Sequence, residues 1–131
     1  MKLYLSGPMR GLPEFNFPAF ALAASLLRAH GHEVHSPAEH DLAAGFDPTG
    51  LTGDEALDEL GFDLTDAMRH DLAFIINEAE GVALLPGWWH SDGAKTEAHV
   101  AQITGKVVAE ILDHRLIEVD PDIRLEVGRV T

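Results

Sequence analysis

The chain alternates between short apolar runs and longer stretches whose apolar residues recur at helical spacing. The short runs predict four buried strands, at residues 2–5, 33–35, 82–85 and 106–111. The helical spacing predicts three helices between them, at residues 17–30, 63–79 and 94–104. Alternating strands and helices imply right-handed crossovers and a mostly parallel sheet that is covered on both faces. We therefore predict an α/β fold, a three-layer α/β/α sandwich of the flavodoxin or Rossmann type, as a single domain over residues 1–131.

Turn-forming residues predict where these elements end. Asn16 is a residue type that caps helices, and Gly31 is well placed to end the first helix in a left-handed conformation. Residues 38–62 contain repeated glycines and acidic residues, and we interpret them as a long excursion over the ligand site, with a short helix at 54–60. The alternating tail predicts one or two further strands, at residues 116–119 and 123–127.

The amino-acid composition excludes several classes of function. The formal net charge of −13 argues against non-specific binding to nucleic acid or to an anionic membrane. It still allows a small phosphorylated ligand held by one or two local cations. The lack of cysteine excludes disulfides, thiolate chemistry and zinc sites built on sulfur. With no long apolar run and no secretory segment at the N-terminus, we expect a cytoplasmic protein that does not enter a membrane.

Two junctions between a strand and a loop carry polar residues at the edge where open α/β sheets bind ligands. The first strand leads into residues 6–11, which include Arg10 between glycines, and the third leads into a loop that ends before Glu97. An arginine on such a loop suits a fixed anion such as phosphate, although an ordinary surface arginine is the alternative. Ser91 offers a hydroxyl to the same anion. These junctions predict a site for a polar or phosphorylated ligand.

Three residues could carry chemistry at this edge. Glu97 is predicted in the first turn of its helix, where the dipole favours an ionised carboxylate that can attack an anomeric carbon. Asp71 borders an apolar helical stripe, so it needs a partner or a function. Tyr4 points away from its strand neighbours and could direct its hydroxyl at a carboxylate. Each residue also has a purely structural interpretation. Glu97 would be a glutamate favoured at a helix start, Asp71 a solvated aspartate at the edge of the core, and Tyr4 a core tyrosine.

Aromatic and histidine residues allow further predictions. Trp88 and Trp89 are adjacent, so we expect one buried ring and one at the site, where it could stack on a planar base. His30, His32 and His35 straddle a helix end and a strand, so their rings should diverge. We expect no metal, because no compact spacing of two histidines and a carboxylate accompanies them. We expect no cofactor, because neither a Walker A loop nor a Gly-x-Gly-x-x-Gly motif occurs.

Together these segments resemble the nucleoside 2-deoxyribosyltransferase superfamily. The resemblance is carried by residues 3–11, 15–20 and 31–39, and by residues 87–97. The last of these read Gly-Trp-Trp-His-Ser-Asp-Gly-Ala-Lys-Thr-Glu, similar to the Gly-Trp-x-x-Ser-x-Gly-Ala-x-x-Glu of a small phage and bacterial branch. The resemblance extends to about Ile111 and leaves the tail unmatched.

The resemblance implies a role for each candidate. Glu97 would be the nucleophile, Tyr4 would orient or activate it, and Asp71 would contribute to the sugar and base site. Transferases of the superfamily usually carry a second glycine where this chain has Lys95. The similar 2'-deoxynucleoside 5'-monophosphate N-hydrolases bind phosphate through a Gly-Ser-x-Arg-Gly loop, in which Pro8 here replaces the serine. The residues expected to bind substrate are Ser6, Gly7, Arg10, Asn16, Trp88, Ser91 and Gly93.

The predicted function is cleavage of the N-glycosidic bond of a 2'-deoxynucleoside or its 5'-monophosphate, by hydrolysis or deoxyribosyl transfer. By the resemblance, the protein would form a homodimer or a larger homo-oligomer. One alternative is a catalytically inactive nucleotide-binding or sensing module of the same fold. A weaker one is an interaction protein whose acidic segment, residues 41–66, docks a basic partner.

Overall fold

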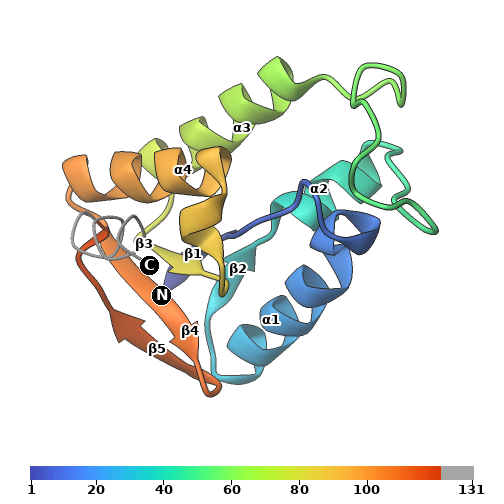
Figure 1. Cartoon of the computed structure of the whole chain (residues 1–131). Coiled ribbons are helices and arrows are strands. Elements are labelled where there is room, and N and C mark those ends of the chain that lie inside the picture. Colours follow the sequence, from blue (N-terminus) through green and yellow to red (C-terminus); the bar gives the residue numbers. More distant parts are fainter. Residues whose placement is uncertain (122–131) are drawn as a thin grey trace.

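The computed structural model describes residues 1–121, which form one five-stranded sheet with helices on both faces (Figure 1). The strand order is β2-β1-β3-β4-β5, the order of flavodoxin-type doubly wound sheets. The first four strands in chain order pair in parallel, and β5 runs antiparallel to β4. The strands are β1 (Lys2–Ser6), β2 (Glu33–His35), β3 (Gly81–Leu84), β4 (Val107–Leu112) and β5 (Arg115–Glu118). The predicted α/β class and mostly parallel sheet are confirmed.

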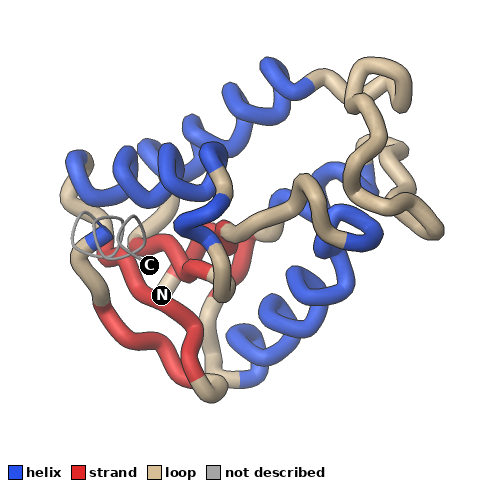
Figure 2. The backbone as a smooth tube through the Cα atoms, in the orientation of Figure 1, coloured by secondary structure: helices blue, strands red, loops and turns tan. Residues whose placement is uncertain are grey.

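Two apolar clusters lie on opposite faces of the sheet. Leu3 and Leu5 pack with Phe20 of α1 (Phe17–Ala29), whereas Tyr4 packs with Ile75 of α3 (Leu64–Asn77) on the other face. The helix α4 (Asp92–Ile103) lies beside α3, and Figure 2 shows the sheet between this pair and α1. These layers form the predicted three-layer sandwich. The alternation along β1 also confirms that Tyr4 points away from its strand neighbours.

The segment after β2 differs from its prediction. A helix, α2 (Pro37–Ala43), occupies the start of the predicted excursion, and turns replace the helix expected at 54–60. The loop that remains is tied to the segment after β1, because the amide N of Gly11 donates to the carbonyl of Gly53 at 2.9 Å. Within the predicted range, residues 57–60 form turns and residues 54–56 are not helical. The prediction of a helix at 54–60 was therefore wrong.

Other boundaries agree with the sequence pattern in part. Asn16 does precede α1, but its φ is 63° and its side chain makes no capping hydrogen bond. Its Nδ2 instead donates to the carbonyl of Pro8 at 2.8 Å, which holds the loop after β1. The strand expected at 116–119 corresponds to β5, and the one expected at 123–127 lies outside the described residues. A bilayer crossing needs a helix of about 20 apolar residues, and the described part of the chain contains none.

Candidate functional site

The helix that carries Glu97 begins earlier than its sequence pattern predicts. Ser91 is the N-cap of α4, and its Oγ accepts a hydrogen bond from the amide N of Ala94 at 3.2 Å. Because the helix starts at Asp92, Glu97 lies in its second turn, so the first-turn prediction was wrong. The helix dipole acts mainly within the first turn, so other groups must hold the Glu97 carboxyl.

Those groups come from β1. The Tyr4 hydroxyl donates to Oε2 of Glu97 at 2.6 Å, and the Ser6 hydroxyl donates to Oε1 at 2.7 Å. Tyr4 and Ser6 alternate with Leu5, so both point to the face that α4 covers. All three groups are buried, and the Glu97 residue is 7% exposed. Both carboxyl oxygens are therefore fixed by hydroxyl donors from a rigid strand.

Asp71 of α3 lies beside this centre. It is buried, and a hydrogen-bonding interaction with Tyr4 lowers its pKa, but burial dominates and raises that pKa to about 6. Burial likewise raises the pKa of Glu97 to about 7, against the lowering effect of the Tyr4 and Ser6 hydroxyls, and the charge of Asp71 adds to the rise. The pKa of Tyr4 is raised well above 10 by burial and then by Glu97. Tyr4 therefore keeps its proton and remains the donor to Glu97.

Sequence reasoning missed several members of the site. Burial, followed by the charge of Asp71, raises the pKa of Asp41 in α2 to about 7. His40 of α2 stacks on His70 of α3, with ring centroids 3.8 Å apart and planes inclined by 8°. The signal for α2 was present as Ser36-Pro37-Ala38-Glu39, because a serine followed three residues later by a glutamate is typical of a helix start. No pattern along the chain places His40 against His70.

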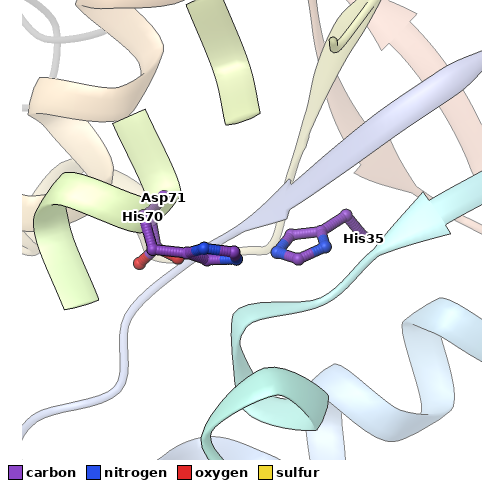
Figure 3. A group of neighbouring side chains, drawn as sticks. All are labelled: His35, His70 and Asp71. Atoms are coloured by element: carbon purple, nitrogen blue, oxygen red, sulfur yellow. The ribbon is translucent and has the colours of Figure 1, made fainter. Parts of the chain in front are cut away.

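Three of these side chains could hold a metal ion. His35, His70 and Asp71 each offer a ligand atom, and the three atoms lie within 4.8 Å of one another. Figure 3 shows the His70 ring extending from α3 toward the His35 ring at the end of β2. The sequence interpretation grouped His35 with His30 and His32 instead. Those two bind the Leu26 carbonyl and the N-terminal amine, and so diverge from His35 as expected.

Within the described residues 1–121, no lysine or arginine forms an ion pair with the buried acids. Among residues 1–121 the ion pairs are Arg28–Glu39 and Lys95–Asp92, and neither includes a carboxylate of the site. Each buried carboxyl therefore gains its hydrogen bonds without a compensating positive charge. This arrangement explains why burial raises the pKa values of Glu97, Asp71 and Asp41 together.

The remaining predicted substrate residues have structural contacts of their own. Arg10 is exposed, and its guanidinium donates to the carbonyls of Glu55 and Asp54 at 2.9 and 3.4 Å. Trp88 is completely buried and donates from Nε1 to Oε1 of Glu110 at 3.0 Å, so Trp89 is the more exposed ring of the pair. The sequence correctly predicted one buried ring, but that ring is Trp88, the tryptophan expected to bind substrate.

The two predicted glycines differ in how closely they are packed. A Cβ on Gly7 would meet the Cβ of Leu85 at 2.6 Å, so this position lets the loop after β1 pass close to the end of β3. A Cβ on Gly93 would meet only the Oγ of Ser91, at 3.9 Å. Gly7 is therefore required by packing, whereas Gly93 leaves open space at the start of α4.

A groove on the surface lies apart from Glu97. It encloses about 730 Å³ between Arg10 and residues 56–65, and Tyr4, Asp71 and Glu97 do not line it. Its acidic residues, Asp58 and Asp63, are exposed. The candidate site is therefore assigned to the hydrogen-bonded carboxyls around Tyr4, where buried groups with perturbed pKa values converge.

Comparison with known proteins identifies one family. A family described as a domain of unknown function (DUF4406) matches residues 1–110, a range that includes Tyr4, Asp71 and Glu97. No curated protein and no solved structure shows a significant match to the chain. Since residues 1–110 make up most of its 131 residues, the chain belongs to the DUF4406 family.

Proposed function

We propose that this protein cleaves the N-glycosidic bond of a 2'-deoxynucleoside or its 5'-monophosphate, with Glu97 as the nucleophile. The observation that carries the proposal is that both carboxyl oxygens of Glu97 accept hydrogen bonds, from Tyr4 at 2.6 Å and from Ser6 at 2.7 Å. An aligned carboxylate close to a second carboxyl group is the arrangement that glycosidic cleavage uses. The resemblance to the nucleoside 2-deoxyribosyltransferase superfamily points to the same three positions.

The reaction would proceed in two steps. In the first, an oxygen of ionised Glu97 forms a bond to C1' as the C1'–N bond breaks, and its electron pair leaves with the base. In the second, water or a second base attacks C1' and releases Glu97, with the proton of the attacking group passing to the leaving carboxylate or to solvent. Tyr4 would hold the carboxylate in line, because its raised pKa keeps its proton in place.

Asp71 is the candidate for protonating or positioning the leaving base. Its pKa of about 6 leaves a protonated fraction near neutral pH, and its position beside Tyr4 brings it close to the nucleophile. A general acid typically contributes about 10²- to 10⁴-fold to the rate. Asp71→Asn should therefore lower the rate by that order while leaving the Glu97 contacts intact.

The test is release of free base from the full chain. The protein is incubated with the four common 2'-deoxynucleosides, their 5'-monophosphates and the matching ribonucleosides, and the bases are separated by chromatography. We expect base from deoxy substrates only, loss of release to the uncatalysed level in Glu97→Gln, and full activity in Glu59→Gln, which alters an exposed carboxylate. Release that persists in Glu97→Gln would refute the covalent mechanism, and release from no substrate would refute the glycosidase.

A nucleotide-binding or sensing module is the second candidate, and the burial of Glu97 favours it. Glu97 is 7% exposed and its pKa is about 7, so part of the population is protonated near neutral pH. A thermal-shift screen with the same compounds separates the two functions. Stabilisation without base release after long incubation supports sensing, whereas turnover supports the enzyme.

The resemblance also leads us to propose a homo-oligomer in which a neighbouring subunit completes the site. Size-exclusion chromatography with light scattering measures the mass directly. A strictly monomeric protein that still releases base would refute the shared site.

A further inference from the structure

A second feature of the molecule lies next to Tyr4, at the end of β2. Tyr4 and His35 are register partners on neighbouring parallel strands, so their side chains share the sheet face that α3 covers. The helix contributes His70 and Asp71, and their ligand atoms lie within 4.8 Å of one another and of a ring nitrogen of His35 (Figure 3). Two imidazoles and one carboxylate thus converge from two elements far apart in the sequence.

The donors are available for a ligand. Nε2 of His35 is buried and has no hydrogen-bond partner among the described residues. Asp71 is buried, and neither ion pair of residues 1–121 includes it. A buried imidazole nitrogen without a partner loses its interaction with water and gains nothing in return. A cation between His35 and Asp71 would satisfy both groups at once.

We propose that His35, His70 and Asp71 form a binding site for a divalent transition-metal ion of the Zn²⁺ class. Two histidines with one carboxylate are a ligand set that zinc accepts, and three protein ligands leave a fourth position for water or another molecule. Carboxylate and imidazole without any thiolate also suit Co²⁺ and Ni²⁺, which serve as probes. The site goes beyond glycosidic cleavage and is measured by binding without turnover, and a metal ion on Asp71 would keep this residue from protonating the leaving base.

To bind a metal ion, the three ligand atoms would have to move slightly closer together. In a tetrahedral zinc site with ligand bonds of about 2.0–2.1 Å, neighbouring ligand atoms lie about 3.3 Å apart. The three atoms here lie within 4.8 Å of one another, so each pair would have to approach by at most about 1.5 Å. His70 is exposed, so its ring can turn toward His35 without disturbing the core. Asp71 is held in place by its burial in α3.

The protonation of His35 is compatible with metal binding. Burial lowers the pKa of His35, and positive charge on His70 or His40 lowers it further, while Glu39 and Glu78 act in the opposite direction. A metal ion binds the neutral imidazole. The lowered pKa therefore leaves His35 in the form that can coordinate.

Aromatic packing is the competing explanation. His35 stacks on Phe74 with ring centroids 4.2 Å apart, and His70 stacks on His40. If packing alone brought the rings together, the cluster would bind no ion and His70→Ala would affect only stability. Binding measurements separate these explanations.

The test uses the full chain without a polyhistidine tag, stripped with chelator and titrated with ZnCl₂ by calorimetry, with Co²⁺ absorption as a second readout. We expect one Zn²⁺ per chain. His70→Ala should lower the affinity at least about tenfold, since even the outer partners of metal ligands contribute about 10- to 100-fold. His70 is the main test position because it is exposed, so its removal should leave the fold intact, as checked by circular dichroism.

The controls are His99→Ala and His90→Ala, which remove exposed histidines away from the cluster and should keep wild-type affinity. His35→Ala and Asp71→Asn should weaken binding as His70→Ala does. The inference is overturned if the wild type binds no Zn²⁺ stoichiometrically. It is also overturned if His70→Ala binds Zn²⁺ as tightly as the wild type or if His99→Ala loses the ion equally.

Discussion

Raising the pH should destabilise this fold, because it ionises the buried carboxyl of Glu97. Burial raises the pKa of Glu97 from 4.5 to about 7. One pKa unit corresponds to about 1.4 kcal/mol, so the full shift is about 3 kcal/mol. Between pH 4.5 and about 7 the folded chain keeps a proton that the unfolded chain has released. This contribution to stability is therefore complete below pH 4.5 and is lost as the pH rises through about 7.

Glu97→Gln isolates this contribution, because the amide stays neutral at every pH and has nearly the same size. The free energy of unfolding is measured for both proteins by urea denaturation between about pH 5 and pH 8. Placing an amide between Tyr4 and Ser6 has a cost that does not vary with pH. The readout is therefore how the difference in the free energy of unfolding between the two proteins changes with pH. We expect that change to be about 2 to 3 kcal/mol, with the variant gaining relative stability as the pH rises.

A matched control and a refuting result complete the design. Glu59 is exposed, so the stability of Glu59→Gln should follow the wild-type curve at every pH. Parallel curves for wild type and Glu97→Gln would show that the carboxyl titrates alike in the folded and unfolded chains. In that case Glu97 would not be buried and hydrogen-bonded in the protein in solution.

Four other substitutions are tested by the same denaturation measurement. Asp41→Asn should remove a further part of the pH dependence, because burial raises the pKa of Asp41 to about 7; an unchanged slope would contradict this. Trp88→Phe should cost about 1–3 kcal/mol, since it removes the hydrogen bond to Glu110 at 3.0 Å, and a neutral effect would contradict that bond. Gly53→Ala should cost about 3 kcal/mol, because a Cβ there would lie 2.0 Å from a backbone oxygen at a φ of +94°. Gly61→Ala, with a φ of +75° and open space, should cost only about 1 kcal/mol, and equal losses would exclude the clash.

The fold was predictable wherever a local pattern determined a side chain's direction. Alternation along β1 placed Tyr4 on the face opposite Leu3 and Leu5, and the structure has it there. The rule that ligand sites gather at the carboxyl ends of parallel strands brought Tyr4 and Glu97 to the same edge. Their hydrogen bond of 2.6 Å joins residues 93 positions apart in the sequence.

The failures have physical causes of two kinds. The helix α2 was missed because residues 38–62 were interpreted as an excursion, although Glu39 three residues after Ser36 signals a helix start. The histidine cluster could not be predicted, since the contact between His40 and His70 depends on how α2 and α3 pack. Asn16 has the residue type of a cap, yet tertiary contacts of the loop after β1 decide where its side chain bonds.

The burial of these carboxyls is itself an argument for function. A domain of this kind is stable by about 5–15 kcal/mol, and ionised Glu97 alone opposes folding by about 3 kcal/mol near neutral pH. Asp71 and Asp41 add to this opposition, because burial raises their pKa values as well. An apolar residue at position 97 would be buried beside Tyr4 without this cost. Destabilising polar groups of this kind concentrate where activity requires them, so the energetic cost supports the proposal that Glu97 and Asp71 act on a ligand.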